Sequence, residues 1–189
     1  MQRTFIALKV EPEKIMVDCY HRIQEALRME KIKWVDPGNL HITLRFLGDT
    51  EAGTVKGISR ILEETIPAYP CPEVVFRGMG LFRNLRDPRV LWIGMDTGPV
   101  LQELKKDLDK KLSALGFPVE ERSFRPHLTL ARIKFIRDRS RLEELINAYR
   151  DTEFQKNRIE EILYYESFLR QEGPRYLPLI KVSFGSEKS

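Results

Sequence analysis

Hydrophobic and polar residues recur with two different periods along this chain. Residues 3–10 (RTFIALKV) have the composition of an opening strand, and residues 11–30 carry an apolar residue at every fourth position, which predicts an amphipathic helix. The apolar stripe of that helix is Ile15, Cys19, Ile23 and Leu27. A Pro-Gly turn at 37–38 then precedes a strand over about 40–47.

The same two periods continue through the rest of the chain. Strands are predicted over 71–84 and 88–96, joined as a hairpin, and again from residue 127, with helices over about 51–66, 100–116 and 138–148. Asp49 or Thr50 is expected to cap the first of these helices, and Gly116 to end the second. Residues 155–185 predict two further strands around a Gly173-Pro174 turn.

A His-x-Thr-Leu phrase occurs twice, as HITLRFLG from His41 and as HLTLARIK from His127, at a separation of 127 − 41 = 86 residues. The same shift places FIAL (5–8) on LWIG (91–94) without a gap and superposes the predicted helices. An internal duplication of strand, helix, strand and helix explains this most economically. We therefore expect one bilobal domain over 1–185, with repeats at about 3–68 and 89–152 facing a central cleft across an approximate two-fold axis. Residues 186–189 are expected to form a frayed tail.

Composition adds modest constraints. A chain of 189 residues with 42% hydrophobic content can build one core, or one core divided between two joined lobes. No uninterrupted apolar stretch approaches the length of a membrane span, and the N-terminus has no signal-peptide pattern, so we expect a soluble cytoplasmic protein. The net charge of +4 suits an anionic ligand without requiring one.

The two motif strands carry the candidate catalytic residues. Because strand side chains alternate, His41, Thr43 and Arg45 should share one face, as should His127, Thr129 and Ala131. A single His-x-Thr is more simply explained by strand packing, but its repetition at equivalent positions favours function. Two imidazoles across a cleft can act as general acid and base in an in-line displacement at phosphorus, with the threonine hydroxyls donating to the non-bridging oxygens. This arrangement requires neither a metal nor a covalent intermediate.

The two motif copies resemble those of the 2H phosphoesterase superfamily, and specifically the RNA 2′,3′-cyclic phosphodiesterases formerly called 2′-5′ RNA ligases. GLFRNLRDPRVLWIG, SFRPHLTLAR and LYYESFLRQEGPRY also follow the family's order, so the resemblance covers nearly the whole chain. It implies a bilobal α+β fold with an antiparallel sheet in each lobe and helices on the outer faces. It also implies hydrolysis of a terminal 2′,3′-cyclic phosphate to a 2′-phosphate, with His41 as proton donor to the 3′ oxygen, His127 as proton acceptor from water, and Thr43 and Thr129 binding the phosphate. Such enzymes can also join RNA ends in reverse through a 2′-5′ linkage.

The resemblance also assigns Phe46 to stacking on the terminal base and Arg132 to the phosphate. Strict alternation puts both on the face opposite the histidines, so a β-bulge or bend must intervene if they are to reach the cleft. Core packing remains open for Phe46, and an acidic protein partner for Arg132. Tyr165 and Tyr176 match aromatic positions of the family, although such strand residues are more often core.

Two rival functions remain open. A metal hydrolase is disfavoured because no third ligand stands at a convincing spacing from both histidines. A non-catalytic module that binds RNA ends or nucleotides is disfavoured because both histidines are present. We therefore expect a partner that is RNA with a 2′,3′-cyclic phosphate end or a small cyclic nucleotide, no cofactor, no metal, no membrane attachment, and a monomer.

Overall fold

Two antiparallel sheets form the framework of the computed structural model, which describes residues 1–121, 123–170 and 173–185. The first sheet has the order β3 (His41–Thr50), β1 (Gln2–Lys9), β8 (Glu161–Leu169) and β9 (Pro174–Ser183). The second has the order β2 (Lys31–Trp34), β6 (His127–Phe135), β5 (Val90–Asp96), β4 (Glu73–Phe82) and β7 (Glu153–Arg158). The predicted α+β class with antiparallel sheets is confirmed, whereas the predicted frayed tail, 186–189, lies outside the described residues.

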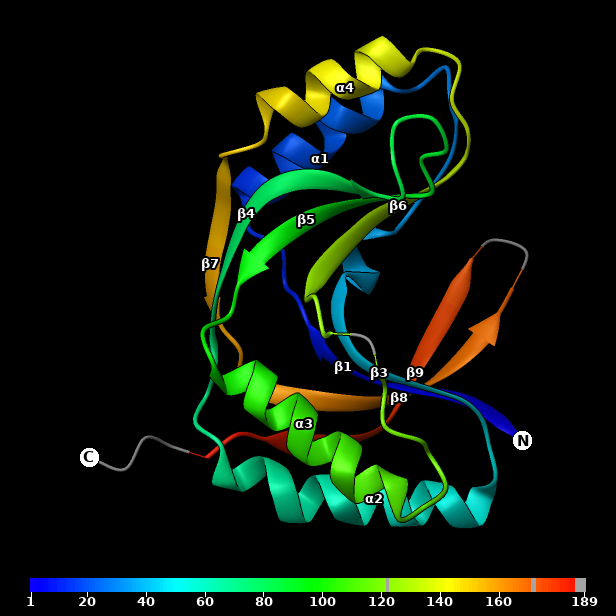
Figure 1. Cartoon of the computed structure of the whole chain (residues 1–189), viewed down its shortest axis with the longest axis vertical. Helices are drawn as coiled ribbons and strands as arrows, with labels where there is room; N and C mark the ends of the chain where they lie inside the picture. Colours follow the sequence, from blue (N-terminus) through cyan, green and yellow to red (C-terminus); the bar gives the residue numbers. More distant parts are fainter. Residues whose placement is uncertain (122, 171–172, 186–189) are drawn as a thin grey trace.

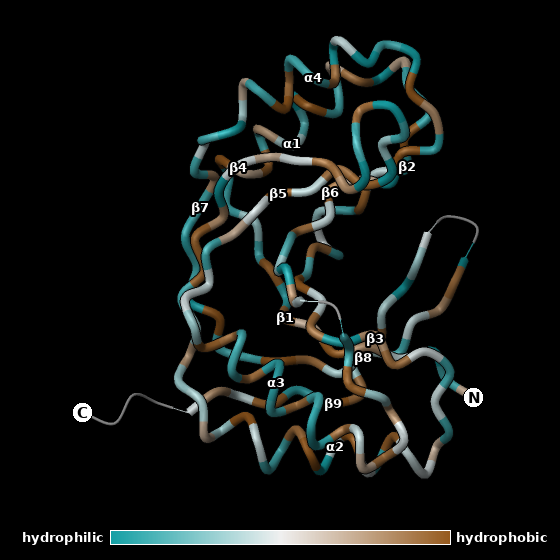
Figure 2. The backbone as a smooth tube through the Cα atoms, in the orientation of Figure 1, coloured by the Kyte–Doolittle hydropathy of each residue, from teal (hydrophilic) through white to brown (hydrophobic). Residues whose placement is uncertain are grey.

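Helices cover the outer face of each sheet (Figure 1). The first sheet is covered by α2 (Ala52–Thr65) and α3 (Val100–Ser113), and we call this unit lobe 1. The second sheet is covered by α1 (Lys14–Ala26) and α4 (Arg139–Ala148), and we call this unit lobe 2. Figure 2 shows the alternation of hydrophobic and hydrophilic residues along these helices, as expected when one face of each is buried.

The two halves of the chain exchange helices between the lobes. Helix α1 follows β1 of the first sheet but contacts β7 of the second, whereas α3 follows β5 of the second sheet but packs beside α2 on the first (Figure 1). Strand β4 also crosses from the first half of the chain into the second sheet. Neither lobe is therefore built from one continuous half of the sequence, and the two lobes are joined by several chain crossings.

The buried stripe of α1 differs from the predicted one. Its buried residues are Met16, Tyr20 and Ile23, followed by Leu27, whereas Ile15 is 62% exposed. The prediction of Ile15 as a core residue is therefore wrong. The reason is Tyr20, whose ring is buried while its hydroxyl donates to the Val35 carbonyl at 2.7 Å. A tyrosine that finds such a partner behaves as an apolar residue and shifts the buried face of the helix.

Three further details of the prediction are corrected. Asp49 and Thr50 do not cap α2, because both belong to β3 and the Thr50 hydroxyl is bonded to Thr4 at 2.8 Å. Strands β2 and β7 were not predicted as separate strands. Both lie at the edges of the second sheet, where one side of the strand is free of hydrogen-bonded neighbours and the sequence is polar.

The strand register defines which positions of the two lobes are equivalent. Ala7 on β1 lies opposite Thr43, and Trp92 on β5 lies opposite Thr129. The offset between the opening strands is therefore 92 − 7 = 85, while the offset between the motif strands is 129 − 43 = 86. The predicted gap-free alignment of the opening strands is wrong by one residue. The extent of the two repeats stays a prediction.

Candidate active site

The two motif strands share the same local distortion. In β3 the pairing register with β1 shifts between Thr43 and Arg45, and in β6 the register with β5 shifts between Thr129 and Ala131. Both strands have the same sequence of half-buried, buried and exposed residues through this bulge. One extra residue reverses the alternation, so residues beyond the bulge change faces.

The bulges turn Phe46 and Arg132 to the face that carries the histidines. Phe46 is 61% exposed and its ring centroid lies 5.9 Å from that of Phe5, which also contacts His41. The side chain of Arg132 is exposed and makes no hydrogen bond or ion pair with any residue that the structure describes. Neither core packing of Phe46 nor an acidic partner of Arg132 is therefore found among the described residues.

The prediction that Ala131 shares a face with His127 is wrong, because the bulge in β6 turns it into the core, where it is fully buried. The bulge in β3 likewise takes Arg45 away from the histidine face, where it was predicted to lie. Its side chain is only 5% exposed on the helix-covered side of the sheet, where it lies 3.4 Å from Asp109 and 3.2 Å from Glu120. It also donates to the Pro118 carbonyl. Lys105, which is also 5% exposed, completes this buried ion cluster through contacts with the same two carboxylates.

Both histidine rings are held by backbone carbonyls at the same relative position. His41 Nδ1 lies 2.7 Å from the Asn39 carbonyl oxygen, and His127 Nδ1 lies 2.9 Å from the Arg125 carbonyl oxygen. A carbonyl oxygen can only accept, so Nδ1 must carry the hydrogen in each ring. The Nε2 atom is thereby left as the acceptor in the neutral form and as the second donor in the protonated form.

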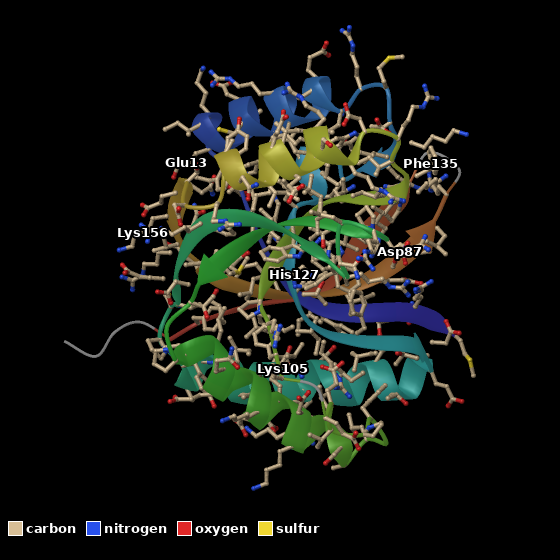
Figure 3. The ribbon with its side chains drawn as sticks, turned by 45° about the horizontal axis from the view of Figure 1, so that its top comes forward. Glu13, Asp87, Lys105, His127, Phe135 and Lys156 are labelled. Atoms are coloured by element: carbon tan, nitrogen blue, oxygen red, sulfur yellow. The ribbon has the colours of Figure 1, made fainter. Side chains whose placement is uncertain are left out.

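Aromatic rings surround both histidines. His41 lies 5.2 Å, between ring centroids, from both Phe5 and Tyr176. Tyr165 stacks on Phe5 at 5.1 Å, and these residues form a small hydrophobic cluster separate from the main core. In lobe 2, Phe82 meets His127 edge-on at 4.6 Å. Figure 3 shows His127 between the strands of the two lobes.

Electrostatic interactions connect the two lobes at this point. Burial lowers the pKa of His41 below its usual value, and the charges of His127 and Arg132 lower it further. Burial raises the pKa of Tyr176, and the charges of Arg132 and Arg3 oppose this shift. His41, His127 and Arg132 are therefore close enough for their charges to interact, although they come from different sheets.

A pocket of about 220 Å³ adjoins His41 on the inner face of the first sheet. Tyr165 and Tyr176 form part of its wall, and Lys9 and Lys181 contribute amino groups. Among the described residues no group of three His, Cys, Asp or Glu side chains could hold a metal ion, and no described helix is long and apolar enough to cross a membrane. Metal-independent action stays a prediction.

Two facing antiparallel sheets, each with a His-x-Thr strand beside the cleft, define a 2H phosphoesterase. The chain belongs to the LigT-like phosphoesterase family, because the family model described as "LigT like Phosphoesterase" matches residues 11–92 and 93–176.

Curated relatives and solved structures agree with this assignment. The chain is 35% identical over 176 residues to the RNA 2′,3′-cyclic phosphodiesterase of Methanothermobacter thermautotrophicus, covering 92% of this chain and 94% of that protein. It is 36% identical over 174 residues to the protein of the same name from Methanocaldococcus jannaschii, covering 92% and 96%. A crystal structure of E. coli LigT complexed with 3′-AMP superposes with a TM-score of 0.76 at 25% identity, covering 97% of this chain and 98% of that one.

Proposed function

We propose that this protein hydrolyses the 2′,3′-cyclic phosphate of RNA ends or of small nucleotides to a 2′-phosphomonoester, with His41 and His127 as acid and base. The observation that carries the proposal is the matched pair of imidazoles. Each begins a motif strand, each is oriented through Nδ1 by the carbonyl two residues earlier, and the two interact electrostatically across the cleft. The relatives named RNA 2′,3′-cyclic phosphodiesterase support the choice of substrate.

In the proposed reaction, His127 Nε2 accepts a proton from water while the water oxygen forms a bond to phosphorus. The bond from phosphorus to the 3′ oxygen breaks, and His41 donates its Nε2 proton to that oxygen. The 2′ oxygen stays attached, which gives the 2′-phosphate. Proton exchange with solvent restores both rings. When the 5′-hydroxyl of a second nucleoside replaces water, the same steps form a 2′-5′ linkage.

Thr43 and Thr129 have the cleft-facing positions needed to donate hydrogen bonds to the two non-bridging oxygens. Arg132 is a cation on this face that can balance the negative charge of the phosphoryl group, because its side chain is paired with no carboxylate among the described residues. Phe46, exposed beside Phe5, is suited to stacking on the terminal base.

The lowered pKa of His41 fits the role of acid only when substrate is bound. In the free protein, burial is the largest cause that disfavours the protonated ring, and the charges of His127 and Arg132 add to it. A phosphodiester between these groups introduces a negative charge that offsets both, so the bound substrate favours the form of His41 that can donate a proton.

Single alanine substitutions at the two histidines test the mechanism. We expect His41→Ala and His127→Ala each to lower kcat/KM for cytidine 2′,3′-cyclic phosphate by about 10²- to 10⁴-fold, the usual contribution of one acid or base group. His21→Ala is the matched control, because this histidine is exposed on α1. Turnover retained in either active-site variant would refute the paired mechanism. A wild-type protein that binds cyclic-phosphate RNA without turnover would instead establish the non-catalytic module.

We further propose that the protein is cytoplasmic, and that it acts as a monomer because one chain supplies both histidine strands of the site. Product analysis on cyclic-phosphate RNAs of different lengths, resolving 2′- from 3′-phosphate, tests the substrate class. Light scattering coupled to gel filtration tests the monomer.

A further inference from the structure

A second pair of aromatic rings faces the cleft from lobe 2 and has no part in the reaction described above. Phe82 on β4 and Trp92 on β5 are both half-buried, and their ring centroids lie 5.6 Å apart. Neither is among the side chains that pack against the two hydrophobic clusters of the described residues. We call these two rings the lobe 2 wall.

The backbone beneath Trp92 leaves space for its ring. Gly80 lies directly opposite Trp92 on β4, and a Cβ atom at Gly80 would stand 2.4 Å from the indole. A Cβ at Gly94, which lies opposite His127 on β6, would stand 3.3 Å from the indole. The two glycines therefore let the indole lie close against the sheet, with its other side toward the cleft.

The lobe 2 wall adjoins the groups proposed to act on the nucleophile. Trp92 lies opposite Thr129 in the strand register, and Phe82 contacts His127 at 4.6 Å. Since Leu91 and Ile93 on either side of Trp92 are buried in the core, alternation places the indole on the same face as Thr129.

The position of lobe 1 that is equivalent to Trp92 carries a small side chain. When the motif strands of the two lobes are aligned so that Phe46 corresponds to Arg132, their pairing partners on the opening strands correspond as well, and Ala7 takes the place of Trp92. Lobe 1 has its own aromatic rings, but they gather around Phe5 beside Phe46 and His41. Each histidine thus has an aromatic surface beside it. Tyr165 and Phe82 hold equivalent register positions in the two surfaces, opposite Phe5 and Val90, whereas Trp92 has no aromatic counterpart in lobe 1.

The chemistry of the reaction gives these two surfaces different tasks. The leaving 3′ oxygen brings its own nucleoside to the His41 side. A water molecule at the His127 side needs no aromatic surface, whereas a nucleoside that presents a 5′-hydroxyl there has a base that can stack. Aromatic rings stack on any base, so such a surface is tolerant of sequence.

We propose that Phe82 and Trp92 form a nucleobase subsite for the nucleoside attached through its 5′ oxygen, so that the cleft holds a dinucleoside with a 2′-5′ phosphodiester. This inference rests on the proposed function. In cleavage, the 3′-hydroxyl of the first nucleoside gives its proton to His41 and its oxygen bonds to phosphorus. The bond from phosphorus to O5′ breaks, and His127 donates a proton to O5′. The products are a 2′,3′-cyclic phosphate and a nucleoside with a free 5′-hydroxyl, and joining is the reverse.

Substrate selectivity tests the subsite. We expect Trp92→Leu to lower kcat/KM for adenylyl-(2′-5′)-adenosine by about 5- to 150-fold more than kcat/KM for cytidine 2′,3′-cyclic phosphate, the size expected for one base stack. Trp92→Phe keeps an aromatic ring and should retain most of the selectivity. It also removes the Trp92 Nε1 donor, which is buried without a partner among the described residues, so it should remain folded. If Trp92→Leu lowers kcat/KM equally for both substrates, or for neither, the proposal is overturned. It is also overturned if the wild type hydrolyses the cyclic nucleotide but neither cleaves nor forms the dinucleotide.

Fluorescence provides a readout that does not depend on turnover. The chain has two tryptophans, Trp34 and Trp92, so Trp34→Phe leaves Trp92 as the only one. We expect adenosine to quench this fluorescence with a saturable dependence on concentration, and Phe82→Leu to weaken the binding. Fluorescence that does not respond to adenosine would overturn the subsite. Quenching in a protein that hydrolyses no cyclic nucleotide would support the subsite while contradicting the proposed function.

Discussion

The buried ion cluster beneath β3 provides a stringent test of the packing in lobe 1. It contains two cations, Arg45 and Lys105, and two carboxylates, Asp109 and Glu120. Three of the four side chains are 8% exposed or less, and Glu120 is 45% exposed. Substitution of Asp109 with asparagine keeps the shape of the side chain but leaves one buried positive charge without its partner.

The size of the effect follows from this burial. Loss of one partner from a buried ion pair costs about 3–5 kcal/mol, because the remaining charge stays in a region that water cannot solvate. Glu120 is different, since solvent reaches its carboxylate, and Glu120→Gln should cost about 1 kcal/mol or less. For a chain of this length, the Asp109→Asn loss corresponds to a fall in Tm of about 6–20 °C.

Urea denaturation followed by circular dichroism measures these free energies of unfolding. Asp18→Asn is the control, because Asp18 pairs with Lys14 on the exposed side of α1 and its loss should leave stability unchanged within error. Lys105→Gln added to Asp109→Asn should recover part of the loss, since it removes the uncompensated cation. If Asp109→Asn is as stable as the control, or if the two changes add without recovery, buried charge compensation is not what holds this region together.

Three further predictions concern pH, metals and backbone conformation. Because the pKa of His41 is lowered in the folded protein, the unfolded chain binds more protons below about pH 6.5. The stability of the wild type relative to His41→Asn should therefore fall between pH 7.5 and 5, whereas the same comparison with His21→Asn should show no such trend. A stability difference that does not depend on pH would contradict the lowered pKa. Dialysis against EDTA should leave kcat/KM unchanged, and a loss that zinc restores would favour a metal hydrolase. Gly78→Ala should destabilise the protein by about 2 kcal/mol or more, because Gly78 has φ 73° and an added Cβ would stand 2.6 Å from the Arg150 carbonyl oxygen. The control Gly53→Ala has open space around it in α2 and should be neutral or stabilising. Equal unfolding free energies for the two variants would exclude strain at Gly78.

The motif strands show how far periodicity alone could predict this site. Alternation correctly placed His41 with Thr43 and His127 with Thr129 on one face, because those residues precede the bulges. It failed at Arg45, which follows a bulge whose position is set by the register against β1. A sequence pattern can indicate that a bulge is required, but the neighbouring strand determines where the extra residue lies.

Other features depend on contacts that no local pattern encodes. The apolar stripe of α1 predicts that one face is buried, but it does not indicate that the helix lies on the sheet that does not contain β1. The edge strands β2 and β7 are short and polar, so their strand character depends on pairing with β6 and β4. The position of Trp92 could have been inferred, because its neighbours Leu91 and Ile93 both fit the core.

Duplication alone would give two equivalent histidines, yet the proposed reaction needs one acid and one base at any moment. The hydrogen bonds from Nδ1 are equivalent in the two lobes, so they do not distinguish the rings. Their surroundings differ, because burial is the largest cause of the lowered pKa of His41 and because the exposed residue after the bulge is Phe46 in lobe 1 but Arg132 in lobe 2. The charges of His127 and Arg132 lower this pKa further, and a phosphodiester bound between these groups would oppose their contribution. Under the proposed mechanism, the substrate therefore supplies a negative charge that favours the protonated form of His41, the form that can act as the acid.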